Sequence, residues 1–307
     1  MGPTASKQGD AVTAVYPVAI IGVGNMGAAM AGRLLAKGWP VHVCDVRPGP
    51  VQALAAQGAV PHALPADAAR AAQLSIVCVV DAKQTHDVLF GAGSVADAMH
   101  LGHSVMLCPT MAPADVEGIT LQLRPFGLHV IDAPMSGGPA RARDGSMSLM
   151  VACQPTVFER HRSLIEALSG KVFRISEKPG DGARTKLVNN LAAGINLVAA
   201  AEVLALAQRL GLDQAATLAV IEQSSGQSWI GSDRMRRAIA GDLAPRAHMT
   251  LLEKDTRLAL QAAQATGFEG PLGARARDVF AAASAGGLAE RDDAALLQWL
   301  SRSDSAD

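Results

Sequence analysis

The stretch AIIGVGNMGAAMAG, residues 19–32, limits the possible folds of this 307-residue chain more than any other. Gly22, Gly24 and Gly27 stand in G-x-G-x-x-G spacing between an apolar run and a helical pattern. Glycine at the first place permits a tight turn, at the second a close approach to the backbone, and at the third close packing of helix on strand. The stretch therefore predicts the first strand and helix of a doubly wound sheet.

Further strand-like runs follow, up to about residue 178. After the glycine turn, Met26, Met30 and Leu34 recur at four-residue intervals, and Gly38 is the expected end of that helix. Strands that alternate with helices predict a mostly parallel Rossmann-type sheet, and runs that are apolar on both faces are typical of a sheet covered by helices. The runs are VAIIGVG, VHVCDV, LSIVCVV, SVMLCPT, LHVIDAPM, MSLMVAC and KVFRIS.

A change of pattern near residue 178 predicts a domain boundary. Pro179, Gly180 and Gly182 interrupt the apolar periodicity, and the pattern from 183 to 300 is helical, with GQSWIGSD and GDLAPRAHM as expected loops. The predicted fold is α/β, an N-terminal Rossmann-type doubly wound sheet followed by a C-terminal all-α domain. The expected segments are a tail at 1–14, a sheet domain at 15–178, a helical domain at 179–302 and a tail at 303–307.

Charge and cysteine usage narrow the class of partner and the compartment. A net charge of -1 offers no basic field for nucleic acid. The apolar stretch 191–206 contains Asn196 and Glu202, which favours a buried helix over a membrane span. The cysteines are widely spaced without a metal-ligand or disulfide pattern, so we expect buried thiols in a reducing, cytoplasmic protein; they are Cys44, Cys78, Cys108 and Cys153.

The glycine turn also predicts a dinucleotide site. The following helix begins with Asn25 and Met26, and its free N–H groups suit phosphate oxygens. Asp45 lies 21 residues beyond Gly24 at the end of a strand, where a carboxylate accepts hydrogen bonds from ribose hydroxyls and repels a 2′-phosphate. This favours NAD, while Arg47 leaves NADP or dual use open. The alternative for Asp45 is a turn residue at a strand end.

Two further clusters carry residues suited to chemistry. Asp132 and residues 136–138 (Ser136, Gly137 and Gly138) follow a strand, so they should lie at the edge of the sheet where ligands bind. The glycine amides and the serine hydroxyl could bind a substrate carboxylate. The alternative interpretation is a simple turn from strand to loop. Lys186, Asn189 and Asn190 share one helical face near a positive helix end. Apolar surroundings lower a lysine pKa toward a range useful for acid/base catalysis. The alternative is a solvated lysine beside two capping amides.

Four segments, in order and spacing, resemble the signatures of the β-hydroxyacid dehydrogenase family over about residues 18–300. They are IGVGNMGAAMAGRLLAKGWPV, IDAPMSGGPARARDGSMSLMV, GDGARTKLVNN and LLEKDTRLAL. The resemblance implies that Lys186 and Asn190 are catalytic. It implies substrate contacts from Ser136, Gly137, Gly138, Asn189 and Trp229. Cofactor contacts are implied for Gly22, Gly24, Asn25, Met26, Gly27, Asp45, Val80, Asp81, Thr110 and Lys254, the lysine of a Lys254-Asp255 pair. Cys108 and Pro109 depart from the family pattern beside the nicotinamide.

The implied activity is NAD-dependent oxidation of a small 3-hydroxy carboxylate of the 3-hydroxyisobutyrate, glycerate/tartronate semialdehyde or threonate type. Lys186 would take the hydroxyl proton as hydride leaves the same carbon, and no metal is expected. The family also implies a homodimer or homotetramer. Two rival functions stay open, a non-catalytic dinucleotide-binding regulator and an imine-reducing relative; the latter usually replaces the lysine.

Overall fold

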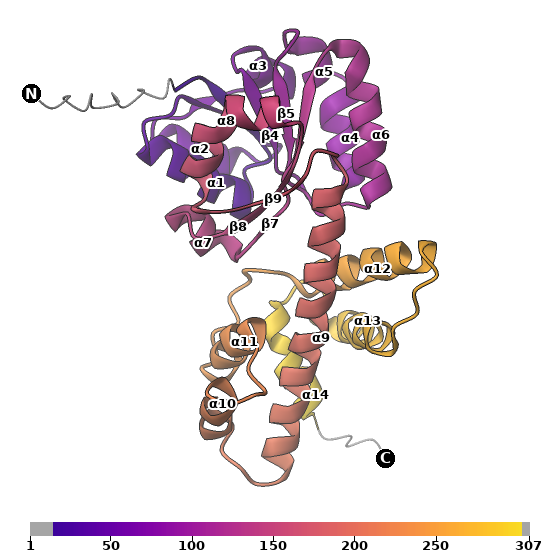
Figure 1. Cartoon of the computed structure of the whole chain (residues 1–307). Helices are drawn as coiled ribbons and strands as arrows, with labels where there is room; N and C mark the ends of the chain where they lie inside the picture. The colour runs from indigo at the N-terminus through magenta and orange to yellow at the C-terminus, as the bar shows by residue number, and fades with distance from the viewer. Residues whose placement is uncertain (1–14, 303–307) are drawn as a thin grey trace, which may run out of the picture.

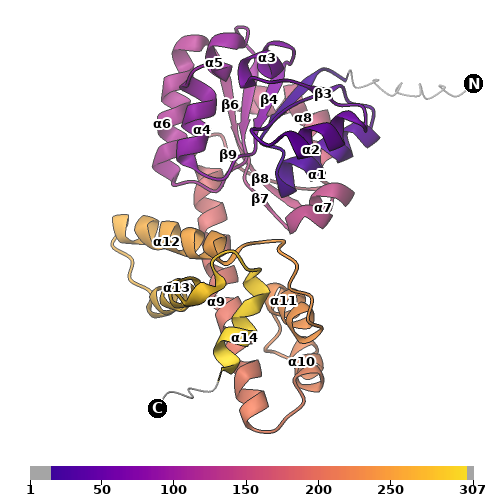
Figure 2. The same cartoon turned by 180° about the vertical axis from the view of Figure 1, so that it is seen from behind.

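The computed structural model describes residues 15–302, so the predicted tails 1–14 and 303–307 lie outside the described residues. A sheet domain and a helical domain lie one above the other, and the long helix α9 (Asp181–Arg209) runs from the first into the second (Figures 1 and 2). Both parts of the predicted fold class are therefore confirmed. The short loop between β9 (Lys171–Ser176) and α9 carries Pro179 and Gly180, whereas Gly182 already lies in the first turn of α9.

The sheet has nine strands in the order β3-β2-β1-β4-β5-β6-β8-β7, with β9 paired to β8. From β3 to β6 the pairing is parallel, whereas β8 runs antiparallel to β6 and β7. The carboxyl ends of β1, β4 and β5 therefore meet at one edge. The remaining strands are β1 (Val18–Ile21), β2 (Val41–Cys44), β3 (Val60–Pro61), β4 (Leu74–Val77), β5 (Ser104–Leu107), β6 (His129–Asp132), β7 (Met135–Ser136) and β8 (Ser148–Ala152).

Alternate residues of the central strands enter two separate cores. Ile20 and Ile76 face the core under α1 and α8, whereas Ile21 and Val77 face the core under α3 to α6. Figure 2 shows these two layers on opposite sides of the sheet. The covering helices are α1 (Asn25–Ala36), α2 (Pro48–Ala55), α3 (Pro65–Arg70), α4 (Ala82–Phe90), α5 (Val95–Ala98), α6 (Pro113–Leu123), α7 (Gly138–Asp144) and α8 (Pro155–Leu168), with a 3-10 turn η1 (Arg124–Phe126).

In the helical domain, α9 is the central element. Its Leu197, Ala201 and Leu204 are buried against Phe280 and Leu296 of later helices. By length and composition α9 could cross a membrane, but the helices packed around it make it the core of a domain and not a membrane span. Its neighbours are α10 (Gln214–Glu222), α11 (Trp229–Ile239), α12 (Met249–Ala265), α13 (Pro271–Ala283), η2 (Ser284–Leu288), η3 (Asp293–Ala295) and α14 (Leu296–Ser301).

Two local predictions are wrong. GQSWIGSD is not all loop, because Ser228 caps α11 by accepting a hydrogen bond from the Gly231 N–H at 3.1 Å, so Trp229 begins a helix. The strand β9 is not buried on both faces: it is an edge strand, and Phe173 is 53% exposed. The second expected loop, residues 241–249, is confirmed up to residue 248, because Met249 already begins α12.

Candidate active site

The turn after β1 has a shape that only glycine permits. Gly22 has a φ of +89°, and a Cβ there would lie 2.7 Å from the carbonyl oxygen of Cys78. A Cβ on Gly27 would collide with the carbonyl oxygen of Gly22, and one on Gly24 would lie 3.2 Å from Nη2 of Arg47. Asn25 and Met26 begin α1, whose N-terminus has no side-chain cap. The turn thus forms a bare backbone cradle of the kind that fits a pyrophosphate.

Asp45 joins the end of β2 to this cradle. Its Oδ2 accepts a hydrogen bond from the Val23 N–H at 2.8 Å, and its Oδ1 accepts one from the Arg47 N–H at 2.9 Å. The Arg47 guanidinium also lies 3.4 Å from Oδ1. The carboxylate therefore holds the backbone of the turn after β2 and lies beside the cradle, so both interpretations of Asp45 remain compatible with its position.

Lys254 of α12 links the helical domain to the carboxyl edge of the sheet. Its Nζ donates to the carbonyl oxygens of Thr110 at 3.0 Å and Val80 at 3.2 Å, beyond the ends of β5 and β4. The structure thus brings together three residues that are far apart in sequence. Asp81, by contrast, caps α4 by accepting a hydrogen bond from the Gln84 N–H at 2.8 Å.

One turn into α9, Lys186 is buried with 8% of its surface exposed. The pKa of its amine is lowered to about 8: burial is the largest cause, the negative charge of Asp255 opposes the shift, and the nearby charge of Lys254 acts in the same direction as burial. Asn190 is also buried and donates from Nδ2 to Oδ2 of Asp255 at 2.6 Å. Asn189 is exposed, and its Nδ2 donates to Oδ1 of Asn190 at 3.1 Å.

Asp255 is the residue of this cluster whose role sequence reasoning missed. Its Oδ1 lies 3.3 Å from Nζ of Lys254, which is ion-pair distance, yet it accepts no hydrogen bond from any described group. A buried carboxylate oxygen without a hydrogen bond is costly, and a bound polar ligand would relieve that cost. The Lys254-Asp255 dipeptide was the only signal in the sequence, since its distance from Asn190 along the chain conceals the contact.

The start of α9 is set by Asp132 at the end of β6. Its carboxylate accepts hydrogen bonds from the N–H groups of Gly180 at 2.7 Å and Ala183 at 3.1 Å, and burial raises its pKa to about 6. A Cβ on Gly182 would lie 2.9 Å from this carboxylate. Asp132 therefore anchors the helix that carries Lys186, and its carboxylate is not part of the loop formed by residues 136–138.

Residues 136–138 form a second glycine turn: Ser136 ends β7, Gly137 links the two elements, and Gly138 begins α7. Gly137 and Gly138 have φ values of +132° and +76°, which favour glycine. Arg141 of α7 stacks on the ring of Trp229, with the guanidinium carbon 4.4 Å from the ring centroid. Trp229, the first residue of α11, therefore contacts the sheet domain beside the Ser136 loop.

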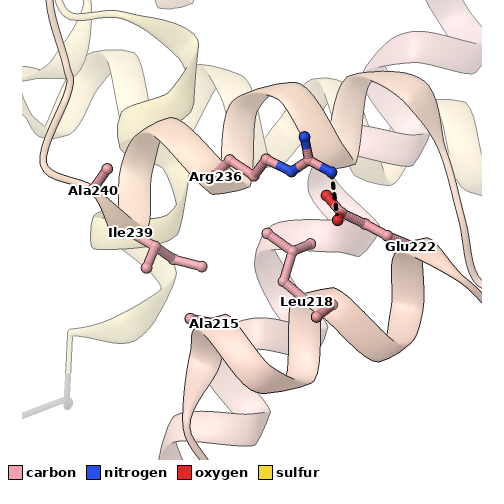
Figure 3. Close-up of a pocket in the computed structure, with 7 residues that line it drawn as sticks. Ala215, Leu218, Glu222, Arg236, Ile239 and Ala240 are labelled. Carbon is pink, nitrogen blue, oxygen red and sulfur yellow. Dashed lines mark hydrogen bonds and ion pairs between the residues drawn. The ribbon is translucent and has the colours of Figure 1, made fainter.

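Neither a metal site nor the hollow between α10 and α11 involves these residues. Within residues 15–302, no group of three or more His, Cys, Asp or Glu side chains could hold a metal ion. A hollow of about 290 Å³ lies between α10 and α11. Figure 3 shows Leu218 and Ile239, which line it together with the ion pair of Glu222 and Arg236. The hollow contains none of the predicted site residues.

The glycine cradle at the carboxyl edge of a doubly wound sheet, with a buried lysine on the adjoining helical domain, defines an NAD(P)-binding oxidoreductase. Residues 17–176 match the NAD binding domain of 6-phosphogluconate dehydrogenase, and residues 180–300 match the NAD-binding domain of NADP-dependent 3-hydroxyisobutyrate dehydrogenase. The chain belongs to the β-hydroxyacid dehydrogenase family, so it is an NAD(P)-dependent enzyme that acts on CH–OH groups.

Three relatives illustrate the similarity. The chain is 37% identical to L-threonate dehydrogenase of Cupriavidus necator, over 92% of this chain and 95% of that protein. It is 31% identical to 2-hydroxy-3-oxopropionate reductase of Escherichia coli, over 91% of this chain and 95% of that protein. The crystal structure of 3-hydroxyisobutyrate dehydrogenase from Salmonella typhimurium superposes with a TM-score of 0.87 at 33% identity, covering 92% of this chain and 99% of that one.

Proposed function

We propose that this enzyme oxidises a small hydroxy carboxylate of three or four carbons with NAD, that Lys186 is its general acid/base, and that L-threonate is the first substrate to test. The observation that carries the proposal is the buried amine of Lys186, with its pKa lowered to about 8, beside Asn190 and Asp255. The named activities of the relatives support the substrate class, and threonate dehydrogenases of 33–37% identity support the choice of threonate.

The proton step follows from the lysine environment. NAD, when bound at the glycine turn, would supply the acceptor for the hydride that leaves the substrate carbon. The neutral amine of Lys186 takes the proton of the hydroxyl on that carbon, and in the reverse direction the ammonium protonates the alkoxide. Assistance of this kind typically contributes 10²–10⁴-fold. Asn190, held by Asp255, positions the hydroxyl group beside the amine.

We assign the remaining roles from the family resemblance and from the positions described above. Ser136, Gly137 and Gly138 would bind the substrate carboxylate, with Asn189 and Trp229 at the edge of the same pocket. The cofactor would be held by Gly22, Gly24, Asn25, Met26, Gly27, Asp45, Val80, Asp81, Thr110 and Lys254. In this assignment Lys254 forms one cofactor-binding group with Val80 and Thr110, because its amine donates hydrogen bonds to the backbone carbonyl groups of both residues.

Steady-state kinetics on a panel of substrates tests the proposal. Threonate, 3-hydroxyisobutyrate and glycerate are offered with NAD and NADP, together with cyclic imines and NADH or NADPH, and the absorbance of the reduced cofactor is followed. We expect threonate turnover with NAD; product identification by NMR then assigns the oxidised carbon. Binding of NADH without turnover of any substrate would favour the regulatory alternative, and turnover of imines alone would favour the imine-reducing one.

The Lys186→Met variant tests the assigned base. We expect turnover to fall by about 10²–10⁴-fold while NADH binding is retained. Lys178→Met is the matched control, since Lys178 is exposed eight positions earlier and should keep full activity. Wild-type turnover in Lys186→Met would refute the role of the amine.

We further propose a cytoplasmic homodimer or homotetramer, with domains at 15–178 and 179–302. The family matches at 17–176 and 180–300 support the boundary. Support for association comes from large apolar side chains that are 44–65% exposed on and after the last turns of α9, namely Val203, Leu206, Leu210 and Leu212. Sedimentation equilibrium measures the assembly, and a monomer at micromolar concentration would contradict it.

A further inference from the structure

We propose that Arg246, from the loop between α11 and α12, binds a phosphate group of the dinucleotide together with Arg47 and Arg143, so that both domains hold the cofactor. The inference rests on the cofactor site of the proposed function but not on the role of Lys186. It assigns a cofactor contact to Arg143 and Arg246, which neither the glycine motif nor the strand-end acid implies.

An open cleft of about 360 Å³ at the glycine turn carries the inference. Gly24, Asn25 and Ala28 form one wall, at the N-terminus of α1. Arg47, Arg143 and Arg246 also line the cleft, and they come from the turn after β2, from α7 and from the helical domain. Figures 1 and 2 show the loop of residues 241–248 passing beneath α7, where the two domains approach. The volume falls within the usual range of small-molecule sites.

The charges around this cleft suit an anion. Three guanidinium groups line it, and two carboxylates pair with them: Asp45 with Arg47, and Asp242 with Arg246 at 2.6 Å. The pair of Arg246 and Asp242 is solvent-exposed, at 49% and 39%, so it is a weak competitor for a bound phosphate. Guanidinium groups and a helix N-terminus are both favourable partners of phosphate oxygens.

The backbone of the loop that carries Arg246 is fixed by hydrogen bonds to a buried carboxylate. The buried carboxylate of Asp292 accepts hydrogen bonds from the N–H groups of Arg246 at 2.7 Å and Ala247 at 3.3 Å. Asp292 is itself paired with Arg237, whose Nη2 lies 2.7 Å from Oδ1 and also donates to the carbonyl of Ala244 at 3.3 Å. Because the backbone is already ordered, only the Arg246 side chain has to be immobilised when a ligand binds.

Two phosphate groups have the required chemistry, and they can be told apart. The pyrophosphate is common to NAD and NADP, whereas the 2′-phosphate belongs to NADP alone. If the arginine contacts the pyrophosphate, its removal weakens the binding of NAD and NADP equally. If the arginine contacts the 2′-phosphate, its removal weakens the binding of NADP alone.

Fluorescence titration of NADH and NADPH into the full-length protein tests the inference without turnover. For Arg246→Gln and for Arg143→Gln we expect the Kd of at least one cofactor to rise about tenfold or more, since each substitution removes a charge-assisted hydrogen bond. Asp242→Asn should lower the Kd, because it releases Arg246. Arg277→Gln, on the exposed surface of α13 beside Asp278, is the matched control and should change neither Kd.

Unchanged Kd values for both cofactors in Arg246→Gln and Arg143→Gln would overturn the inference. Arg143 is exposed and belongs to the other domain, so this variant remains informative if Arg246→Gln fails to fold. Wild-type binding of NADH without hydroxy-acid turnover would defeat the proposed function and leave this inference standing. Threonate turnover by the wild type, with unchanged Kd values in both variants, would support the proposed function and overturn this inference.

Discussion

The protonation of Lys186 is the most direct test of how the structure prepares the site. Burial shifts the pKa of this amine from 10.5 to about 8. At about pH 7.5 an amine of pKa 8 is about one-quarter neutral, whereas an unshifted lysine is neutral in about one molecule in a thousand. The buried site therefore increases the population of the base form by on the order of 10²-fold.

Asp255 limits this shift, because its negative charge favours the ammonium form. Asp255→Asn removes that charge while keeping nearly the same shape and an oxygen that can accept the Asn190 bond. We expect the pKa of Lys186 in this variant to fall below 8 by about one unit or more.

The pH dependence of kcat/KM for hydroxy-acid oxidation measures the effect, since it reports the pKa of the essential base in the free enzyme. In the wild type, kcat/KM should rise with pH and level off above about pH 8. In Asp255→Asn the midpoint should move to lower pH, and Asp278→Asn, an exposed site, should leave it unchanged. A midpoint in Asp255→Asn that stays in place or moves upward would refute this electrostatic account.

Three further predictions follow from individual contacts. Gly27→Ala should abolish NADH binding because its Cβ meets the carbonyl of Gly22, whereas Gly32→Ala, where the added Cβ has ordinary contacts, should bind normally in the same titration. Burial lowers the pKa of His161 to about 4, so the unfolded state binds the extra proton between about pH 6.5 and 4; about 3 kcal/mol of stability should be lost as the pH falls through this window. Denaturant unfolding at a series of pH values measures this loss, and a His161→Asn variant with an equally steep pH dependence would contradict it. Lys254→Met removes two hydrogen bonds between the domains. The melting temperature of this variant, measured by calorimetry, should therefore fall by about 2–4 °C, and its KM for NAD should rise. Wild-type values of both quantities would argue against a cross-domain role of Lys254.

The sequence by itself determined the elements whose causes are local. The glycine turn could be identified because steric limits on φ and on Cβ positions act within a few residues. Lys186 and Asn190 could be placed on one face because the period of a helix is the same wherever it occurs. The two-domain arrangement followed in the same way, from strand-like runs that give way to helical ones.

The tertiary structure alone decided the contacts between distant segments. Asp255 meets Asn190, Asp132 holds the start of α9, and Arg246 reaches the cleft beside Gly24. No local pattern predicts these contacts, because each depends on how two independently formed elements pack. The buried environment that lowers the pKa of Lys186 has the same origin: the helix supplies the amine, and the domains packed around it remove the water.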